Sequence, residues 1–172
     1  MRAIVKACQS GPIDAQVEVV VSPKDLTVAT EWAKEQHIPV MIVPPGDQES
    51  ADLQSALNGV DIVCLAGFLR LLPETILDSF PGRVLNIHPA LLPKFGGKGM
   101  YGSHVHEAVL AAGETESGCS VHRVTRVYDE GEVLVQLKCP VLPEDTAETL
   151  AARVLELEHR AYPMAIQKVL RG

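Results

Sequence analysis

Short apolar runs alternate with helix-like spacing of apolar residues through the first half of the chain. Four runs have the length and composition of buried strands, at residues 17–21, 40–43, 61–67 and 83–88. Three intervening stretches have the spacing of helices, at residues 25–36, 50–57 and 74–79. Strands that alternate with helices are typical of parallel sheets covered by helices.

The remaining pattern predicts helices at residues 2–9, 104–112 and 145–170, and strands at residues 119–124 and 132–137 joined by a hairpin-type connection. The first helix has no capping residue, because Met1 stands in that place. Asp145 is expected to cap the last helix, with Glu148 completing a capping box. With no repeat or linker, the prediction is one α/β domain over residues 1–172, an open, mostly parallel Rossmann-like sheet flanked by helices.

Composition narrows the class of protein. Hydrophobic residues make up 47% of the chain and aromatic residues only 4%, so aliphatic side chains must build the core. A formal net charge of -7, without a long run of Lys or Arg, argues against nucleic acid and anionic membranes as partners. No apolar run reaches membrane-spanning length and the start lacks an export signal, so a cytoplasmic location is expected. Four widely separated cysteines favour reduced, buried thiols over zinc or disulfides.

Two polar residues interrupt the run at 83–88. Asn86 and His88 are two positions apart, so in a strand their side chains project from the same face near its carboxyl end, where ligands bind in open α/β sheets. Pro89 biases His88 towards an extended conformation. An amide donor beside an imidazole suits a reaction in which charge grows on a carbonyl oxygen and a proton moves. A polar strand end with a surface histidine is the alternative.

A carboxylate and an apolar turn are the next candidates. Asp129 lies in the connection between the last two strands, and near His88 it would raise the histidine pKa and hold its tautomer. Ordinary turn chemistry is the alternative. Residues 65–72, LAGFLRLL, form either a tight turn with Arg70 in solvent or an apolar slot for a flat heterocycle.

The other polar residues do not form a P-loop or a metal site. The glycines around Lys98 do not make a P-loop, because no Ser or Thr follows the lysine. His104 and His106 are two apart at a helix start, which excludes one shared metal ion, and no metal site is predicted. His122 is either a core histidine or a site residue. Glu158 on the last helix is by default a solvated carboxylate.

Four motifs taken together resemble the phosphoribosylglycinamide formyltransferases. They are LAGFLRLL at 65–72, NIHPALLP at 86–93 followed by a lysine and glycines, SVHRV at 120–124 with Asp129 downstream, and EHRAYP at 158–163. The match runs from about residue 3 to 170, and NIHPxLLP is specific to folate-dependent formyl-transferring enzymes. The resemblance implies a formyltransferase fold. It also implies transfer of the formyl group of 10-formyltetrahydrofolate to the amine of glycinamide ribonucleotide in purine synthesis, without a metal and with these small molecules as partners.

The resemblance also implies roles for individual residues. His88 would act as the acid near the formyl oxygen, Asn86 would hydrogen-bond the tetrahedral oxyanion, and Asp129 would tune His88 and help to move the proton of the attacking amine. Glu158 would contact the ribonucleotide. The folate would lie against Leu69, Arg70, Leu71, Leu72, Asn86, Thr125, Arg126, Val127, Tyr128 and Asp129.

The chain departs from the family pattern in two places. The family begins with a strand and a Gly-Ser-Asn loop for the ribonucleotide phosphate, whereas this chain begins in the helix that follows. We therefore expect an N-terminally truncated domain with a gap in its parallel sheet. Residues 44–50, PPGDQES, also lack the arginine that family members often place near the folate.

Other functions remain open beside this one. Formyltetrahydrofolate hydrolases use the same Asn, His and Asp groups with water as the acceptor, but normally carry an extra N-terminal domain. Methionyl-tRNA formyltransferases need a C-terminal RNA-binding domain and a basic surface, which the net charge of -7 does not suit. A non-catalytic, folate-binding remnant without the nucleotide site belongs to a different class.

Overall fold

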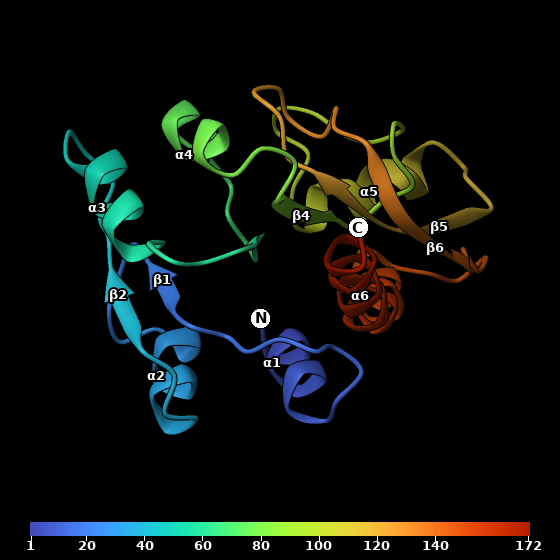
Figure 1. Ribbon diagram of the computed structural model, residues 1–172. Helices are drawn as coiled ribbons and strands as arrows, with labels where there is room; N and C mark the ends of the chain where they lie inside the picture. Colours follow the sequence, from blue (N-terminus) through green and yellow to red (C-terminus); the bar gives the residue numbers. More distant parts are fainter.

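Two separate sheets run through the molecule, which a computed structural model describes for all 172 residues (Figure 1). The strands are β1 (Val20–Ser22), β2 (Val40–Ile42), β3 (Val63–Leu65), β4 (Val84–His88), β5 (Glu116–Arg123) and β6 (Val133–Pro140). The helices are α1 (Arg2–Gln9), α2 (Val28–Glu35), α3 (Glu49–Ala56), α4 (Glu74–Ser79), α5 (Ser103–Ala111) and α6 (Ala147–Leu170). None of the helices combines the length and hydropathy that a bilayer span requires.

The strand order explains how the sheets are connected. β1 pairs in parallel with β2, and the second sheet has the order β3-β4-β5-β6. β3 and β4 are parallel, whereas β5 and β6 join as antiparallel strands. The predicted α/β class with flanking helices is confirmed. β1 and β3 each keep one edge without a strand partner.

Helices cover both faces of the sheets. Neighbouring residues of β4 point to opposite sides, so Val84 joins an apolar cluster with α3 and α4, while Leu85 joins a larger cluster with α1, α5 and α6. Tyr162 is buried in α6, and its hydroxyl lies 2.7 Å from the carbonyl oxygen of Leu65 and 2.9 Å from that of Leu85. The long helix is thereby fixed across β3 and β4.

The cap of the last helix differs from the prediction. Thr146, not Asp145, is the N-cap, because its backbone is extended and its hydroxyl accepts a hydrogen bond from the amide of Thr149. Asp145 instead accepts two hydrogen bonds from Arg153, at 2.6 and 2.8 Å. The absence of a side-chain cap at Met1 is confirmed.

Strand lengths differ from the prediction according to how the strands pair. The expected strand at 17–21 is reduced to β1, and that at 61–67 to β3, because each pairs on only one edge over three residues. β5 and β6 extend beyond the apolar runs at 119–124 and 132–137, since antiparallel pairing continues through the polar residues.

Candidate active site

The carboxyl end of β4 positions the first two candidate residues. Asn86 and His88 lie on the same face of the strand as Val84, as their spacing predicts. His88 is only 3% exposed, and its Nε2–H donates to the carbonyl oxygen of Phe95 at 2.7 Å. Phe95 belongs to the loop after β4, so the backbone of that loop orients the imidazole.

Asp129 reaches the same place from the connection between β5 and β6. Its backbone has a φ of 57°, and its Oδ2 lies 3.5 Å from Nδ1 of His88. The same oxygen accepts a hydrogen bond from the amide of Gly97 at 2.9 Å. Gly96 permits this approach, because a Cβ there would lie 3.1 Å from the Cβ of Asp129 and 2.7 Å from Leu92 Cδ2. The loop glycines therefore have a definite role that the sequence did not reveal.

His122 completes the cluster. It pairs with Asn86 in the β4–β5 register, on the strand adjacent to β4. Its Nε2 lies 3.4 Å from Oδ1 of Asp129 and 3.3 Å from Nδ2 of Asn86, and its Nδ1–H donates to the carbonyl oxygen of Arg123 at 2.9 Å. The sequence did not decide whether His122 is a core or a site residue. In the structure its ring connects Asn86 to Asp129.

Two backbone carbonyl oxygens determine which ring nitrogens of His88 and His122 carry a proton. A carbonyl oxygen only accepts, so Phe95 holds a proton on Nε2 of His88 and Arg123 holds one on Nδ1 of His122. In a neutral His88 ring Nδ1 carries a lone pair, which faces Oδ2 of Asp129. Nε2 of His122 faces Oδ1 of Asp129 and donates a hydrogen bond to it when it carries a proton. The cluster therefore has two places in which an additional proton can be held between an imidazole and a carboxylate.

Burial shifts the pKa of His88 in the direction opposite to the one expected. Burial lowers its pKa, and this outweighs the raising effects of the Asp129 charge and the Phe95 carbonyl. For Asp129, burial alone would raise the pKa, but the His122 hydrogen bond, the Gly97 amide and the nearby imidazoles lower it overall. At neutral pH the cluster thus holds an ionised carboxylate beside a neutral His88.

The two segments assigned to folate lie close to each other. Arg126 forms ion pairs with Glu74 at 3.0 Å and Asp78 at 2.8 Å, which fixes the loop at 125–129 against α4, the helix that follows residues 69–72. Three large apolar residues of these segments are exposed: Leu69 by 58%, Leu71 by 48% and Val127 by 52%. Leu72 is buried. This arrangement leaves apolar side chains free for a flat ligand.

Arg70 is held rather than free in solvent. Its guanidinium makes two hydrogen bonds to Glu49 of α3, at 3.0 and 2.6 Å, and stacks 5.1 Å from the ring centre of Phe68. Its charge is therefore already paired, so contacts from this segment to a heterocycle would come from its backbone and from Leu69 and Leu71.

Glu158 lies on α6, near the end of the sheet that carries the cluster. α6 runs antiparallel to β6, since Arg153 donates to the carbonyl of Pro140 and Lys168 to that of Leu134. It therefore also runs antiparallel to β4, and Glu158, one turn before Tyr162, lies towards the carboxyl ends of β3 and β4. Burial raises the pKa of this carboxyl group. Glu158 forms no hydrogen bond or ion pair with Asn86, His88 or Asp129.

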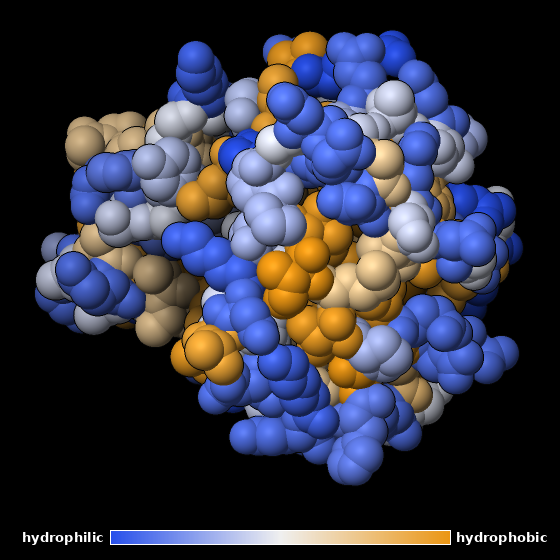
Figure 2. Space-filling view, turned by 90° about the vertical axis from the view of Figure 1, so that its left-hand side faces the viewer, coloured by the Kyte–Doolittle hydropathy of each residue, from blue (hydrophilic) through white to orange (hydrophobic).

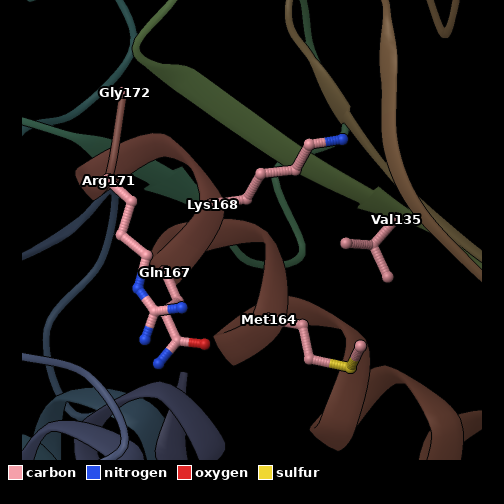
Figure 3. Close-up of a pocket in the computed structure, with 6 residues that line it drawn as sticks. All are labelled: Val135, Met164, Gln167, Lys168, Arg171 and Gly172. Atoms are coloured by element: carbon pink, nitrogen blue, oxygen red, sulfur yellow. The ribbon is translucent and has the colours of Figure 1, made fainter.

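A cavity of about 360 Å³ lies away from the cluster, between β6 and the last turns of α6, where Lys168 and Arg171 are among the lining residues (Figure 3). His104 is exposed and contacts Glu107, while His106 is buried. No group of three or more His, Cys, Asp or Glu side chains is arranged to hold a metal ion. All four cysteines are free thiols.

Comparison with known proteins agrees with this geometry. The formyl transferase family model matches residues 1–166. The chain is 43% identical to the chloroplastic phosphoribosylglycinamide formyltransferase of Arabidopsis thaliana over 94% of its own length, and spans 58% of that protein. It is 32% identical to the Haemophilus influenzae phosphoribosylglycinamide formyltransferase, covering all of this chain and 82% of the other.

Solved structures agree in fold. A phosphoribosylglycinamide formyltransferase from Brucella melitensis superposes with a TM-score of 0.89 at 40% identity, over all of this chain and 90% of that chain. The matched span includes β3 to α6 and therefore the cluster of Asn86, His88, His122 and Asp129. The chain belongs to the formyl transferase family.

Proposed function

We propose that this protein transfers the formyl group of 10-formyltetrahydrofolate to the amine of glycinamide ribonucleotide, in purine synthesis. The observation that carries the proposal is the cluster of Asn86, His88 and Asp129 at one strand end, joined through His122. The names of the relatives in Arabidopsis thaliana and Haemophilus influenzae support formyl transfer to phosphoribosylglycinamide.

The cluster supplies each group that formyl transfer needs. When the amine nitrogen bonds to the formyl carbon, the carbonyl π electrons move to oxygen, and Asn86 Nδ2 can donate a hydrogen bond to this oxyanion. The amine must lose a proton, and N10 of the folate must gain one as its bond to carbon breaks. Asp129 and Nδ1 of His88 hold the first proton between them, and the same pair returns it to the leaving nitrogen.

The binding surfaces follow from the site. In this proposal the folate lies against residues 69–72 and 125–129, and Glu158 contacts the ribonucleotide at the end of β3 and β4. The exposed apolar side chains of the first two segments support the folate position. The burial of Glu158 supports a carboxyl group that is reserved for a polar partner. We place the reaction in the cytoplasm.

We also propose that residues 1–172 form one formyltransferase domain that an additional strand completes. The unpaired edges of β1 and β3 support this, because a strand between them would join the two sheets and precede α1. The loop after such a strand would supply the contacts to the ribonucleotide phosphate. An in-frame sequence upstream of Met1 with the strand and Gly-Ser-Asn pattern is the expected finding.

The direct test is an assay of the purified protein with both substrates. Formation of formylated glycinamide ribonucleotide together with tetrahydrofolate supports the proposal. Release of formate at the same rate without the ribonucleotide would indicate a hydrolase, and folate binding without turnover would indicate a remnant. The assay should include a protein extended by any upstream strand, because loss of the phosphate contacts lowers ribonucleotide affinity without altering the cluster.

A further inference from the structure

A row of polar side chains extends from the cluster across the sheet. His88 of β4 pairs with Ser120 of β5, and Ser120 pairs with Gln136 of β6. Side chains of directly paired residues in antiparallel strands lie on the same face of the sheet, so these three residues are neighbours on the face that carries Asn86. Ser120 is 0% exposed, and its hydroxyl forms no hydrogen bond with the cluster itself.

The loop after β4 and Gln136 use the whole hydrogen-bonding capacity of the Ser120 hydroxyl. The hydroxyl donates to the carbonyl oxygen of Ala90 at 2.7 Å and accepts from the amide of Leu92 at 3.0 Å. It also accepts from Nε2 of Gln136 at 2.8 Å, and the same Nε2 donates to the carbonyl oxygen of Leu92 at 3.1 Å. A hydroxyl group has one proton and two lone pairs, so all of them are taken. Ser120 and Gln136 thereby hold three backbone groups of residues 90–92.

The held segment is the beginning of the loop that orients His88. Leu92 is three residues before Phe95, whose carbonyl oxygen accepts the hydrogen bond from Nε2 of His88. The buried side chain of Leu92 also packs against the loop at Gly96, where a Cβ would lie 2.7 Å from Leu92 Cδ2 and 3.1 Å from the Cβ of Asp129. Gly96 thus lies between Leu92 and Asp129, so a displacement of Leu92 would move the loop relative to the carboxylate.

We propose that Ser120 is a positioning residue for His88. By holding residues 90–92, its hydroxyl fixes the path of the loop, and the loop places the Phe95 carbonyl oxygen against Nε2 of the ring. The ring proton then stays on Nε2, and the lone pair of Nδ1 stays directed at Asp129. For turnover this inference rests on the proposed formyl transfer, whereas the state of the ring is measured without it.

A purely structural role for Ser120 would have different consequences. If the hydroxyl only stabilises the sheet, its removal lowers the free energy of unfolding and leaves the His88 ring of the folded molecules unchanged. If it positions the ring, the folded molecules themselves change, because the Phe95 carbonyl is no longer held and the proton can move to Nδ1, which then donates to Asp129. The tautomer of His88 therefore separates the two roles.

The test is ¹⁵N NMR of the His88 ring in the full chain, at a pH at which the ring is neutral. The parent should show a proton on Nε2 only, whereas in Ser120→Ala both ring nitrogens should show shifts averaged between the two tautomers. Gln136→Leu, at an exposed position, removes the two hydrogen bonds of the amide and should give the same change to a smaller extent. Ser117→Ala is the matched control, because this serine of β5 is also buried but its Oγ has no partner, and it should keep the tautomer of the parent.

Turnover gives the second measurement, in a protein that is active in the formyl transfer assay. Ser120→Ala should lower kcat about tenfold, because misplaced groups slow the chemical step, and should change the KM of either substrate by less than about twofold. Ser117→Ala should keep the kcat of the parent.

Two results would overturn the proposal. One is an Nε2 proton retained in both Ser120→Ala and Gln136→Leu, and the other is a kcat of Ser120→Ala equal to that of Ser117→Ala. If Ser120→Ala does not fold, the tautomer in Gln136→Leu decides. If the parent transfers no formyl group, the proposed function fails, and the tautomers still decide this inference.

Discussion

The two sheets of this molecule differ in how firmly the structure holds them. β1 and β2 are each three residues long. In β2, the side chains of Met41 and Ile42 are 40% and 39% exposed. β5 and β6 are eight residues long, and Val84 and Leu85 of the neighbouring β4 are 1% and 0% exposed. Figure 2, which views the molecule from the side of β2 and α3, shows apolar surface among polar side chains.

The difference matters because the whole cluster of Asn86, His88, His122 and Asp129 lies on the better-supported sheet or on its β5–β6 connection. Asn86 and His88 come from β4, His122 from β5 and Asp129 from the connection between β5 and β6. The first sheet contributes none of these side chains. The geometry of the cluster therefore depends on β4, β5 and the connection after β5, and not on β1 and β2.

Hydrogen exchange should show the largest difference between the sheets. The backbone amides of β1 and β2 are expected to exchange at least about three orders of magnitude faster than those of β4 and β5, because short strands with free edges open locally without unfolding the rest. Exchange measured by NMR at single residues checks this. Equal protection in both sheets would show that they unfold as one unit.

Substitutions of apolar residues should also cost different amounts of stability in the two sheets. Leu85→Ala is expected to lower the free energy of unfolding by about 3 kcal/mol, because a fully buried side chain leaves a cavity. Met41→Ala, at a position 40% exposed, should cost less than about 1 kcal/mol. Urea denaturation of both variants gives the comparison, and a larger loss for Met41→Ala would reverse it.

Substitutions in the cluster should reduce turnover with little effect on folding. His88→Ala or Asn86→Ala, in a protein that is active in the formyl transfer assay, is expected to lower turnover by about 100-fold or more, the usual effect of losing an acid or an oxyanion donor. Lys34→Ala, an exposed residue on α2 paired with Asp25, is the control and should retain activity. Unchanged turnover in either cluster variant would refute the assignment.

The sequence predicted the elements well where local signals agree with tertiary pairing. The helix at 74–79 has the predicted bounds, and β4 ends at His88 as Pro89 indicates. The cap of α6 was misassigned because Asp145 and Thr146 are both good capping residues, and only the backbone geometry distinguishes them.

The candidate site was predictable in part. Asn86, His88 and Asp129 were identified, partly from spacing and partly from family resemblance, and the structure brings them together. The contribution of His122 was not decided, because β-strand pairing across 36 residues sets it opposite Asn86 and no local pattern reports that register. The direction of the His88 pKa shift was wrong, since burial cannot be read from the charge of a nearby aspartate.

The smallest effect expected is the dependence of stability on pH, which should follow the buried histidines. Burial lowers the pKa of His88 and His106 in the folded protein, so below about pH 6.5 the unfolded chain binds protons that the folded chain does not. The free energy of unfolding therefore falls as pH decreases below 6.5, by up to about 1.4 kcal/mol per pH unit for each histidine. Asp129 does not contribute in this range, since its lowered pKa keeps its stabilisation intact above about pH 3.8.

Substitution of a single histidine isolates this dependence. His106→Leu removes a buried ring whose Nδ1 has no hydrogen-bond partner, so denaturation at pH 7.5 and 5.5 should show a smaller loss of stability than in the parent. His104→Leu changes a ring that is 60% exposed, and its loss should equal that of the parent. If both variants lost as much stability as the parent between these pH values, His106 would titrate as an ordinary exposed histidine, and its burial would not be maintained in solution.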